Sequence, residues 1–145
     1  MIQQITVFIE NRPGRLTDIL KVLAKHQIDL NGISIADSSD FGLFRMILSD
    51  PEKGQEVLKQ SGYIVKSTDV LAIDVHDTPG GLLHALDSIA QKGINVLYMY
   101  AFGTKLSSRA MIIIKTDDNQ RTTSILTQIG VEVLSLDEVE KRLNI

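Results

Sequence analysis

Hydrophobic and polar residues follow one order of patterns at the start of the chain, and the same order returns in its second half. Residues 5–10 (ITVFIE) place every second apolar side chain on one face of a strand, and residues 71–75 do the same. A helical pattern follows each strand, with apolar residues at i, i+3, i+4 and i+7 from Leu16 and again from Leu82. We therefore expect two copies of one structural unit.

A constant spacing between matching residues supports this repeat. The pairs that lie 66 residues apart include Pro13 with Pro79, Gly14 with Gly80, Leu16 with Leu82 and Ile28 with Ile94. Gly62 and Gly130 match at a spacing of 68, so the second copy carries two extra residues, expected in a loop near 116–120. We assign the copies to residues 1–69 and 70–145.

The rest of each copy predicts two strands joined by a hairpin loop, a second helix and a short closing strand. The hairpin loops are expected at 37–42 and 103–108, the second helices at about 51–61 and 119–128, and the closing strands at 63–68 and 131–135. With right-handed crossovers, each copy becomes an antiparallel βαββαβ sheet with both helices on one face, the ferredoxin-like α+β arrangement.

Three single residues predict boundaries between these elements. Gly93 is expected to be the C-cap of the first helix of the second copy. Asp69 is expected to stand between the closing strand of one copy and the opening strand of the next, with no linker. Ser135 has capping-box spacing to Glu138, which predicts a final helix.

The composition narrows the classes of function. Fifteen basic and 18 acidic residues give a net charge of −3 without a long basic cluster, which argues against a nucleic-acid partner. The absence of cysteine excludes disulfides, thiolate metal ligands and cysteine nucleophiles. The first residues are no signal peptide, and no apolar stretch approaches the roughly 18 residues of a membrane span. We expect a cytoplasmic protein with no membrane partner.

The Pro-Gly dipeptide at each strand–helix junction is the main candidate for chemistry. Proline suits the first helical position, and glycine allows a ligand to approach the backbone. Helix N-terminal amides attract a carboxylate. The amides expected to be free belong to Gly14, Arg15, Leu16, Gly80, Gly81 and Leu82. Asn11 and Asp77 can accept a hydrogen bond from an ammonium group, so the turns suit a free amino acid. In the alternative interpretation, Asn11, Asp77 or Thr78 only caps its own helix.

The tandem pattern with ENRPGRL (10–16) and DTPGGL (77–82) resembles the ACT domain family, and residues 10–30 resemble the regulatory domain of phosphoglycerate dehydrogenase. The resemblance implies a non-catalytic regulatory protein that binds a free L-amino acid between two ACT domains and regulates amino-acid metabolism through a separate metabolic enzyme. It implies neither a cofactor nor a metal. The ligand-binding residues that we assign are Asn11, Arg12, Pro13, Gly14, Arg15, Leu16, Asp29, Ser34, Asp77, Thr78, Pro79, Gly80, Gly81, Leu82, Asn95, Tyr98 and Tyr100.

The two sites are expected to be unequal. Serine-binding members of the family carry an asparagine at the start of the second strand, where this chain has Asn95 in one copy and Asp29 in the other. The turns also differ, since Arg15 stands opposite Gly81.

Other residues suggest alternative functions. His76 and His84 lack a third ligand for a metal and are expected at the surface. Tyr98, Tyr100 and Phe102 alternate on one face, where related RNA-binding modules stack bases, although those modules use the first and third strands. The third strand of each copy is apolar on both faces, so both faces of the sheet are expected to be covered, and we predict a homodimer. A protein-binding or RNA-binding module without a small ligand is therefore the second hypothesis, and an acylphosphatase-like enzyme using the Asn and Arg of NRPGR is the third.

Overall fold

The computed structural model describes residues 1–37, 40–103 and 108–144, so the predicted hairpin loops lie partly outside the described residues. The chain forms two compact units. The first consists of residues 3–68, and the second consists of residues 69–145 together with residues 1–2.

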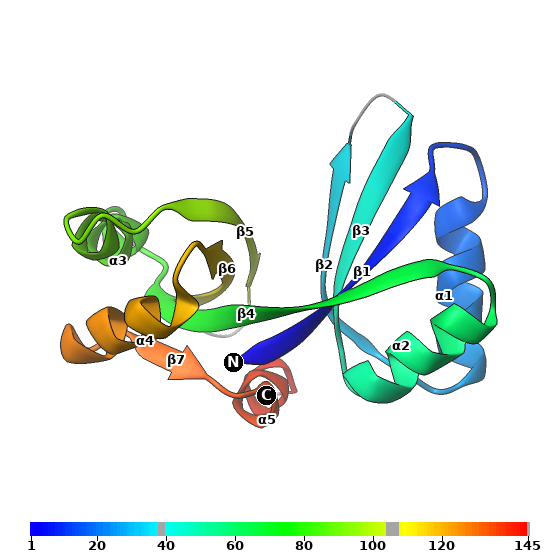
Figure 1. The fold of residues 1–145 in the computed structure, drawn as a ribbon. Helices are drawn as coiled ribbons and strands as arrows, with labels where there is room; N and C mark the ends of the chain where they lie inside the picture. The colour runs from blue at the N-terminus through cyan, green and yellow to red at the C-terminus, as the bar shows by residue number, and fades with distance from the viewer. Residues whose placement is uncertain (38–39, 104–107, 145) are drawn as a thin grey trace. The chain divides into compact units, whose positions relative to one another are not determined.

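The first unit is a four-stranded sheet with two helices on one face (Figure 1). Its elements are β1 (Ile2–Glu10), α1 (Arg15–Lys25), β2 (Leu30–Asp37), β3 (Phe41–Leu48), α2 (Pro51–Gln60) and the first part of β4 (Ile64–His76). The strand order is β2-β3-β1-β4, and β3 is antiparallel to both of its neighbours.

The second unit repeats this arrangement and adds a C-terminal helix (Figure 1). Its elements are the second part of β4, α3 (Gly81–Ala90), β5 (Val96–Gly103), β6 (Arg109–Thr116), α4 (Asn119–Gln128), β7 (Glu132–Leu134) and α5 (Leu136–Leu143). β4 lies between β7 and β6, β5 lies outside β6, and all these pairs are antiparallel. The predicted α+β fold of two ferredoxin-like units is confirmed.

Each unit has its own hydrophobic core between the sheet and its helices. In the first unit, alternate β1 residues such as Val7 pack with Ile19 and Leu23 of α1, as the helical stripe predicts. The prediction is wrong for Leu20, which is 41% exposed. The second core is built in the same way from alternate β4 residues and the apolar stripe of α3. In β6, Met111 and Ile113 are buried on the face turned away from these helices. The doubly apolar strand is therefore covered without a second copy, and the homodimer stays a prediction.

The predicted break at Asp69 is wrong, because β4 runs without interruption from Ile64 to His76. This segment contains neither glycine nor proline, so nothing in the backbone ends the strand. The side-chain amide of Asn119 donates a hydrogen bond of 2.9 Å to the carbonyl of Asp69, which satisfies that backbone group in place of a turn. One strand thus closes the first sheet and continues as a central strand of the second.

Local signals located most helix ends. α4 has the predicted bounds, and α2 ends one residue early, at Gln60. The capping box is confirmed, because Ser135 and Glu138 exchange hydrogen bonds of 2.7 and 3.2 Å between side chain and backbone. The prediction for Gly93 is wrong by two residues, since Gln91 is the C-cap of α3. Gly93 reverses the chain just beyond it, with φ of +76°.

Gln27→Gly is expected to stabilise the protein. Gln27 occupies the position of Gly93 in the first copy and has φ of +58°, a conformation that costs a residue with a side chain about 1 kcal/mol. Part of this gain is lost because glycine loses more entropy on folding. We expect a melting temperature about 1–3 °C higher. Gly93→Gln is the matched control and should lower it, whereas a lower value for Gln27→Gly would contradict the assigned strain.

Candidate functional site

The two Pro-Gly motifs form type II turns that connect a strand to a helix. Gly14 has φ of +89° and ψ of −11°, and Gly80 has φ of +87° and ψ of −6°, values typical of the third residue of this turn. The prediction that proline occupies the first helical position is wrong. Pro13 and Pro79 lie two residues earlier, because the left-handed glycine stands between each proline and its helix.

In each turn, one amide that was predicted to be free donates a hydrogen bond within the turn itself. The N–H of Arg15 donates to the carbonyl of Arg12 at 3.5 Å, and the N–H of Gly81 donates to the carbonyl of Thr78 at 3.0 Å. These two amides are therefore corrected from ligand donors to turn donors. The following amides, beginning with Leu16, have no acceptor within their own helix.

Side-chain capping does not explain these turns. Gly14 and Gly80 are themselves the N-caps of α1 and α3, and neither helix receives a side-chain cap hydrogen bond. By contrast, Asp50 and Asp118 cap α2 and α4 with their carboxylates. The alternative in which Asn11, Asp77 or Thr78 caps its own helix is therefore wrong, and the N-termini of α1 and α3 stay open.

A pocket of about 300 Å³ lies beside the first turn. Its polar lining comes from Glu10, Asn11, Arg12, Arg15 and Asp37. Its apolar lining comes from Ile9, Leu16, Ile35 and Gly42. The pocket thus joins the turn to the end of edge strand β2, with cationic and anionic groups around an apolar floor. Such a lining suits a small ligand that carries both charges.

Arg15 is the most constrained of these polar residues. Its guanidinium carbon lies 5.5 Å from the ring centroid of Tyr63, close enough for a cation–π contact. Its Nε is buried and has no hydrogen-bond partner among the described residues. Since buried donors normally find an acceptor, we expect a ligand or water oxygen at this atom.

The other charged residues of the pocket are more accessible. Arg12 Nε lies 3.2 Å from a carboxylate oxygen of Glu10, in an exposed ion pair that contributes little to stability. Asp37 ends β2 and is exposed. These side chains can therefore exchange their present contacts for contacts with a ligand at small cost.

Several predicted residues of the first copy do not line this pocket. Pro13 and Gly14 shape the turn without entering the lining. Ser34 is the register partner of Arg45, so it lies on the face of the sheet opposite Ile35. Asp29 lies at the far end of β2, where its N–H donates to the Ser49 hydroxyl at 3.0 Å.

The second turn is surrounded differently. A pocket of about 260 Å³ lies at the start of α3, and Gly81 is the one predicted site residue in its lining. Asn95 lies at the far end of β5, where its N–H donates to a carboxylate oxygen of Asp117 at 3.1 Å. Tyr98 and Tyr100 are half-buried on the sheet face turned away from α3. The two turns therefore share the same backbone conformation, but different side chains surround them.

The sequence reasoning missed the strand residues of the first pocket, and the register could have supplied them. Ile9 pairs with Gly42, and Gly42 pairs with Asp37, so all three lie in one row across the sheet. Aligning the predicted strands by their buried faces would have placed this row beside the turn.

The described part of the chain contains no group of three or more His, Asp or Glu side chains that could hold a metal ion. Over the same residues, no helix is both long and apolar enough to cross a membrane.

Comparison with known proteins identifies the family. The profile of the ACT domain pair family matches residues 1–142. The crystal structure of protein BT0572 from Bacteroides thetaiotaomicron is 34% identical, covers 97% of this chain and 96% of its own, and superposes with a TM-score of 0.91. No curated protein matches the chain.

Two more distant structures share the fold. The ligand-free regulatory subunit of aspartate kinase from Thermus thermophilus is 15% identical, with a TM-score of 0.65 and coverage of 88% of this chain and 92% of its own. The corresponding subunit from Thermus flavus is 18% identical, with a TM-score of 0.60 and coverage of 87% and 90%. Together with the family match, the repeated fold and its paired turns show that this chain belongs to the ACT domain family, as a pair of ACT domains.

Proposed function

We propose that this protein is a non-catalytic regulatory protein that binds a free L-amino acid in the pocket beside Asn11–Leu16. The observation that carries the proposal is the mixed lining of this pocket, which combines two arginines, two carboxylates and apolar side chains beside an open helix N-terminus. A free amino acid presents the matching groups, because its carboxylate and its ammonium group are bonded to the same carbon.

We propose a role for each side of the pocket. The ligand carboxylate lies toward the N-terminus of α1, where the amide of Leu16 and the unpartnered Nε of Arg15 can donate to it. The ligand ammonium lies toward Asp37 and the side chain of Asn11. The ligand side chain then contacts Ile35 and its apolar neighbours, which favours an aliphatic or small side chain.

The likeness of residues 10–30 to the phosphoglycerate dehydrogenase regulatory domain makes serine the first amino acid to test. Asp29 and Asn95 cannot reach the turn of their own copy, because each lies at the opposite end of its edge strand. A role for either residue in ligand binding therefore requires a second ACT domain beside the turn. A homodimer, a separate metabolic enzyme as partner and a cytoplasmic location belong to the same proposal.

A thermal-shift screen of the full chain against the twenty L-amino acids tests the proposal. A ligand that binds the folded state stabilises it by RT ln(1 + [L]/Kd), about 2.7 kcal/mol at 100 times Kd. We expect at least one amino acid to raise the melting temperature, and Asn11→Ala and Asp37→Asn to reduce that rise. Asp77→Ala, in the second turn, is the matched control and should leave it unchanged.

Other outcomes decide between the hypotheses. Flat curves for all twenty amino acids at millimolar concentration would remove the proposal. A shift produced by acyl phosphate alone would favour the enzyme hypothesis, and a shift produced by oligonucleotides would favour the RNA-binding one.

A further inference from the structure

The floor of the pocket beside Asn11–Leu16 is formed by one row of the first sheet. Ile9 of β1 pairs with Gly42 of β3, and Gly42 pairs with Asp37 of β2. All three residues line the pocket. Ile9 belongs to the hydrophobic core between sheet and helices, so the row lies on the face of the sheet that carries α1 and α2. Gly42 has no side chain, and it therefore leaves space between its two neighbours.

The end of the Ile9 side chain lies in this space. A Cβ atom at Gly42 would lie 3.1 Å from Cγ1 and 3.3 Å from Cδ1 of Ile9, closer than the optimal separation of about 3.5–4.0 Å between carbon atoms. The carbonyl oxygen of Ala36 would lie 3.9 Å away, at an ordinary contact distance. A methyl group at residue 42 would therefore displace Ile9. Because Ile9 is 6% exposed and packs in the core, the pocket is the side toward which it can move.

The second unit builds the corresponding row with a different pair of residues. Val75 of β4 pairs with Ala110 of β6, at the positions that Ile9 and Gly42 occupy in the first unit. The two pairs contain the same number of side-chain carbon atoms, but one methyl group has moved to the strand next to the edge strand. In the first unit, glycine instead lets the longer side chain lie low over β3, and the pocket begins above it.

The other apolar residues of the lining are aliphatic. Leu16 and Ile35 complete the floor. Ile35 is 53% exposed on edge strand β2, so a hydrocarbon group that covers it removes apolar surface from water. A hydroxyl group placed on this floor would lose hydrogen bonds to water and find no polar side chain in exchange, because Ile9, Leu16 and Ile35 are hydrocarbon. The floor therefore favours an aliphatic ligand side chain over that of serine.

The charges of the pocket fit a ligand with an uncharged side chain. Arg12 Nε and a carboxylate oxygen of Glu10 form an ion pair with each other at 3.2 Å. In the proposed pose, Arg15 holds the ligand carboxylate and Asp37 holds the ligand ammonium group. Every charged residue of this lining then has a counter-charge, and a charged ligand side chain would have none.

We propose that the amino acid bound in this pocket has a branched aliphatic side chain, as in leucine, valine and isoleucine, and that the Ile9–Gly42 pair determines this specificity. The inference rests on the proposed amino-acid site and names the class of its ligand. The ligand side chain lies over Ile9 and Gly42, between Leu16 and Ile35. A methyl group at residue 42 raises the end of Ile9 into the same place.

Calorimetric titration of the full chain with L-leucine, L-valine, L-alanine and L-serine tests the proposed class. We expect leucine or valine to bind at least about tenfold more tightly than alanine and serine, because each buried methylene group strengthens binding about fourfold. Gly42→Ala should weaken leucine binding at least about tenfold, the lower end of the effect of one methylene group in a ligand pocket. Alanine does not reach the floor, so its binding should change much less.

Two further variants separate the floor from general effects on stability. Gly54→Ala is the matched control, because it makes the same substitution in the same unit, within α2 and outside the pocket lining. It should leave the ratio of leucine to alanine binding unchanged. Ile9→Val removes the Cδ1 atom and deepens the floor, so it should raise that ratio by up to about fourfold. This conservative change keeps the test decisive if Gly42→Ala does not fold.

The possible failures are distinguishable. Tighter binding of alanine or serine than of leucine would overturn the proposed class. An unchanged ratio of leucine to alanine binding in both Gly42→Ala and Ile9→Val would overturn the role of the floor. If none of the twenty amino acids binds, the proposed function itself fails, whereas binding with another preference refutes this inference alone.

Discussion

Gly81→Ala is expected to lower the free energy of unfolding by about 3 kcal/mol, the upper part of the range for overpacking. The added Cβ would lie 2.1 Å from the carbonyl oxygen and 3.1 Å from the carbonyl carbon of His76. Both are backbone atoms of a strand held by β6 and β7, so either the strand or the first turn of α3 has to move. Chemical denaturation of the full chain measures the loss.

Gly54→Ala is the matched control. Its Cβ would lie 2.3 Å from the Cδ1 atom of Leu48, which is the end of a flexible side chain. Alanine is also the better helix former by about 1 kcal/mol, which offsets part of the cost inside α2. A loss for Gly81→Ala no larger than that for Gly54→Ala would show that β4 yields easily at His76.

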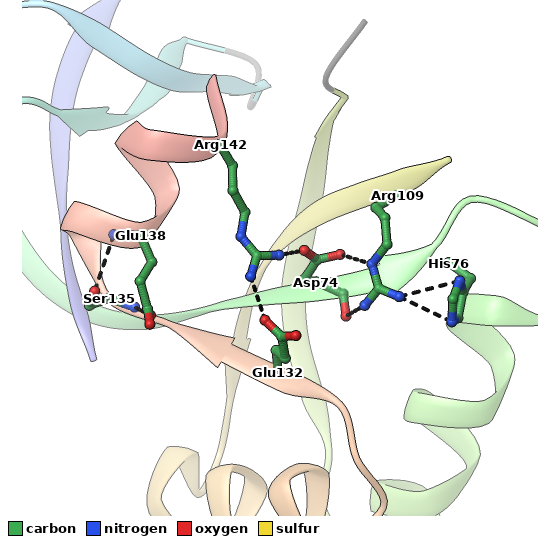
Figure 2. A network of polar contacts seen from close by, with 7 residues as sticks. All are labelled: Asp74, His76, Arg109, Glu132, Ser135, Glu138 and Arg142. Atoms are coloured by element: carbon green, nitrogen blue, oxygen red, sulfur yellow. Dashed lines mark hydrogen bonds and ion pairs between the residues drawn. The ribbon is translucent and has the colours of Figure 1, made fainter. Parts of the chain in front are cut away.

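Asp74→Ala is expected to destabilise the protein by about 2–3 kcal/mol. Asp74 is 2% exposed and accepts from Arg109 Nε at 2.7 Å, while Arg142 of α5 reaches its other oxygen (Figure 2). Removing the carboxylate leaves two guanidinium groups without their shared counter-charge. Both arginines are 31% exposed, and Arg142 keeps Glu132 as a partner, which holds the loss below that of a fully buried pair.

Thermal and chemical unfolding of Asp74→Ala and Asp74→Asn measure this contribution. The asparagine variant keeps the shape of the side chain, so a similar loss in both variants assigns the effect to charge. Asp137→Ala removes the exposed pair with Lys141 and should cost less than about 1 kcal/mol. Equal effects at Asp74 and Asp137 would contradict the role of the buried carboxylate in holding α5.

The elements that depend on nearby residues were predictable. The burial of Ile19 and Leu23, the bounds of α4 and the capping box at Ser135 each follow from residues within a few positions of one another. The repeat added the order of the strands, because one copy supported the assignment of the other. The fold was therefore accessible from pattern and spacing.

Features that depend on distant residues were not predictable. Continuation of β4 through Asp69 rests on its neighbouring strands and on Asn119, fifty positions away. The contact between Arg15 and Tyr63 requires α1 and the start of β4 to meet in space. The register between β1, β3 and β2 decides which side chains lie beside the turn. The alternation of apolar residues within one strand predicts the face of each residue but not its partner in the neighbouring strand.

The two copies show how one backbone can present different chemistry. Both turns keep proline and a left-handed glycine, and both helices keep open N-termini. Arg15 and Gly81 separate them, because one side chain fills the space beside the turn and the other leaves it empty. This single difference leaves the two turns with differently lined pockets.

The most direct test of amino-acid binding is a ¹H–¹⁵N titration of the full chain with the L-amino acid that gives the largest thermal shift. The proposed function predicts saturable shifts at Gly14, Leu16 and Gly42, with weaker binding of the D-enantiomer and of the Asp37→Asn variant. Unchanged signals at these three amides, whatever shifts elsewhere, would contradict an amino-acid site beside the first turn.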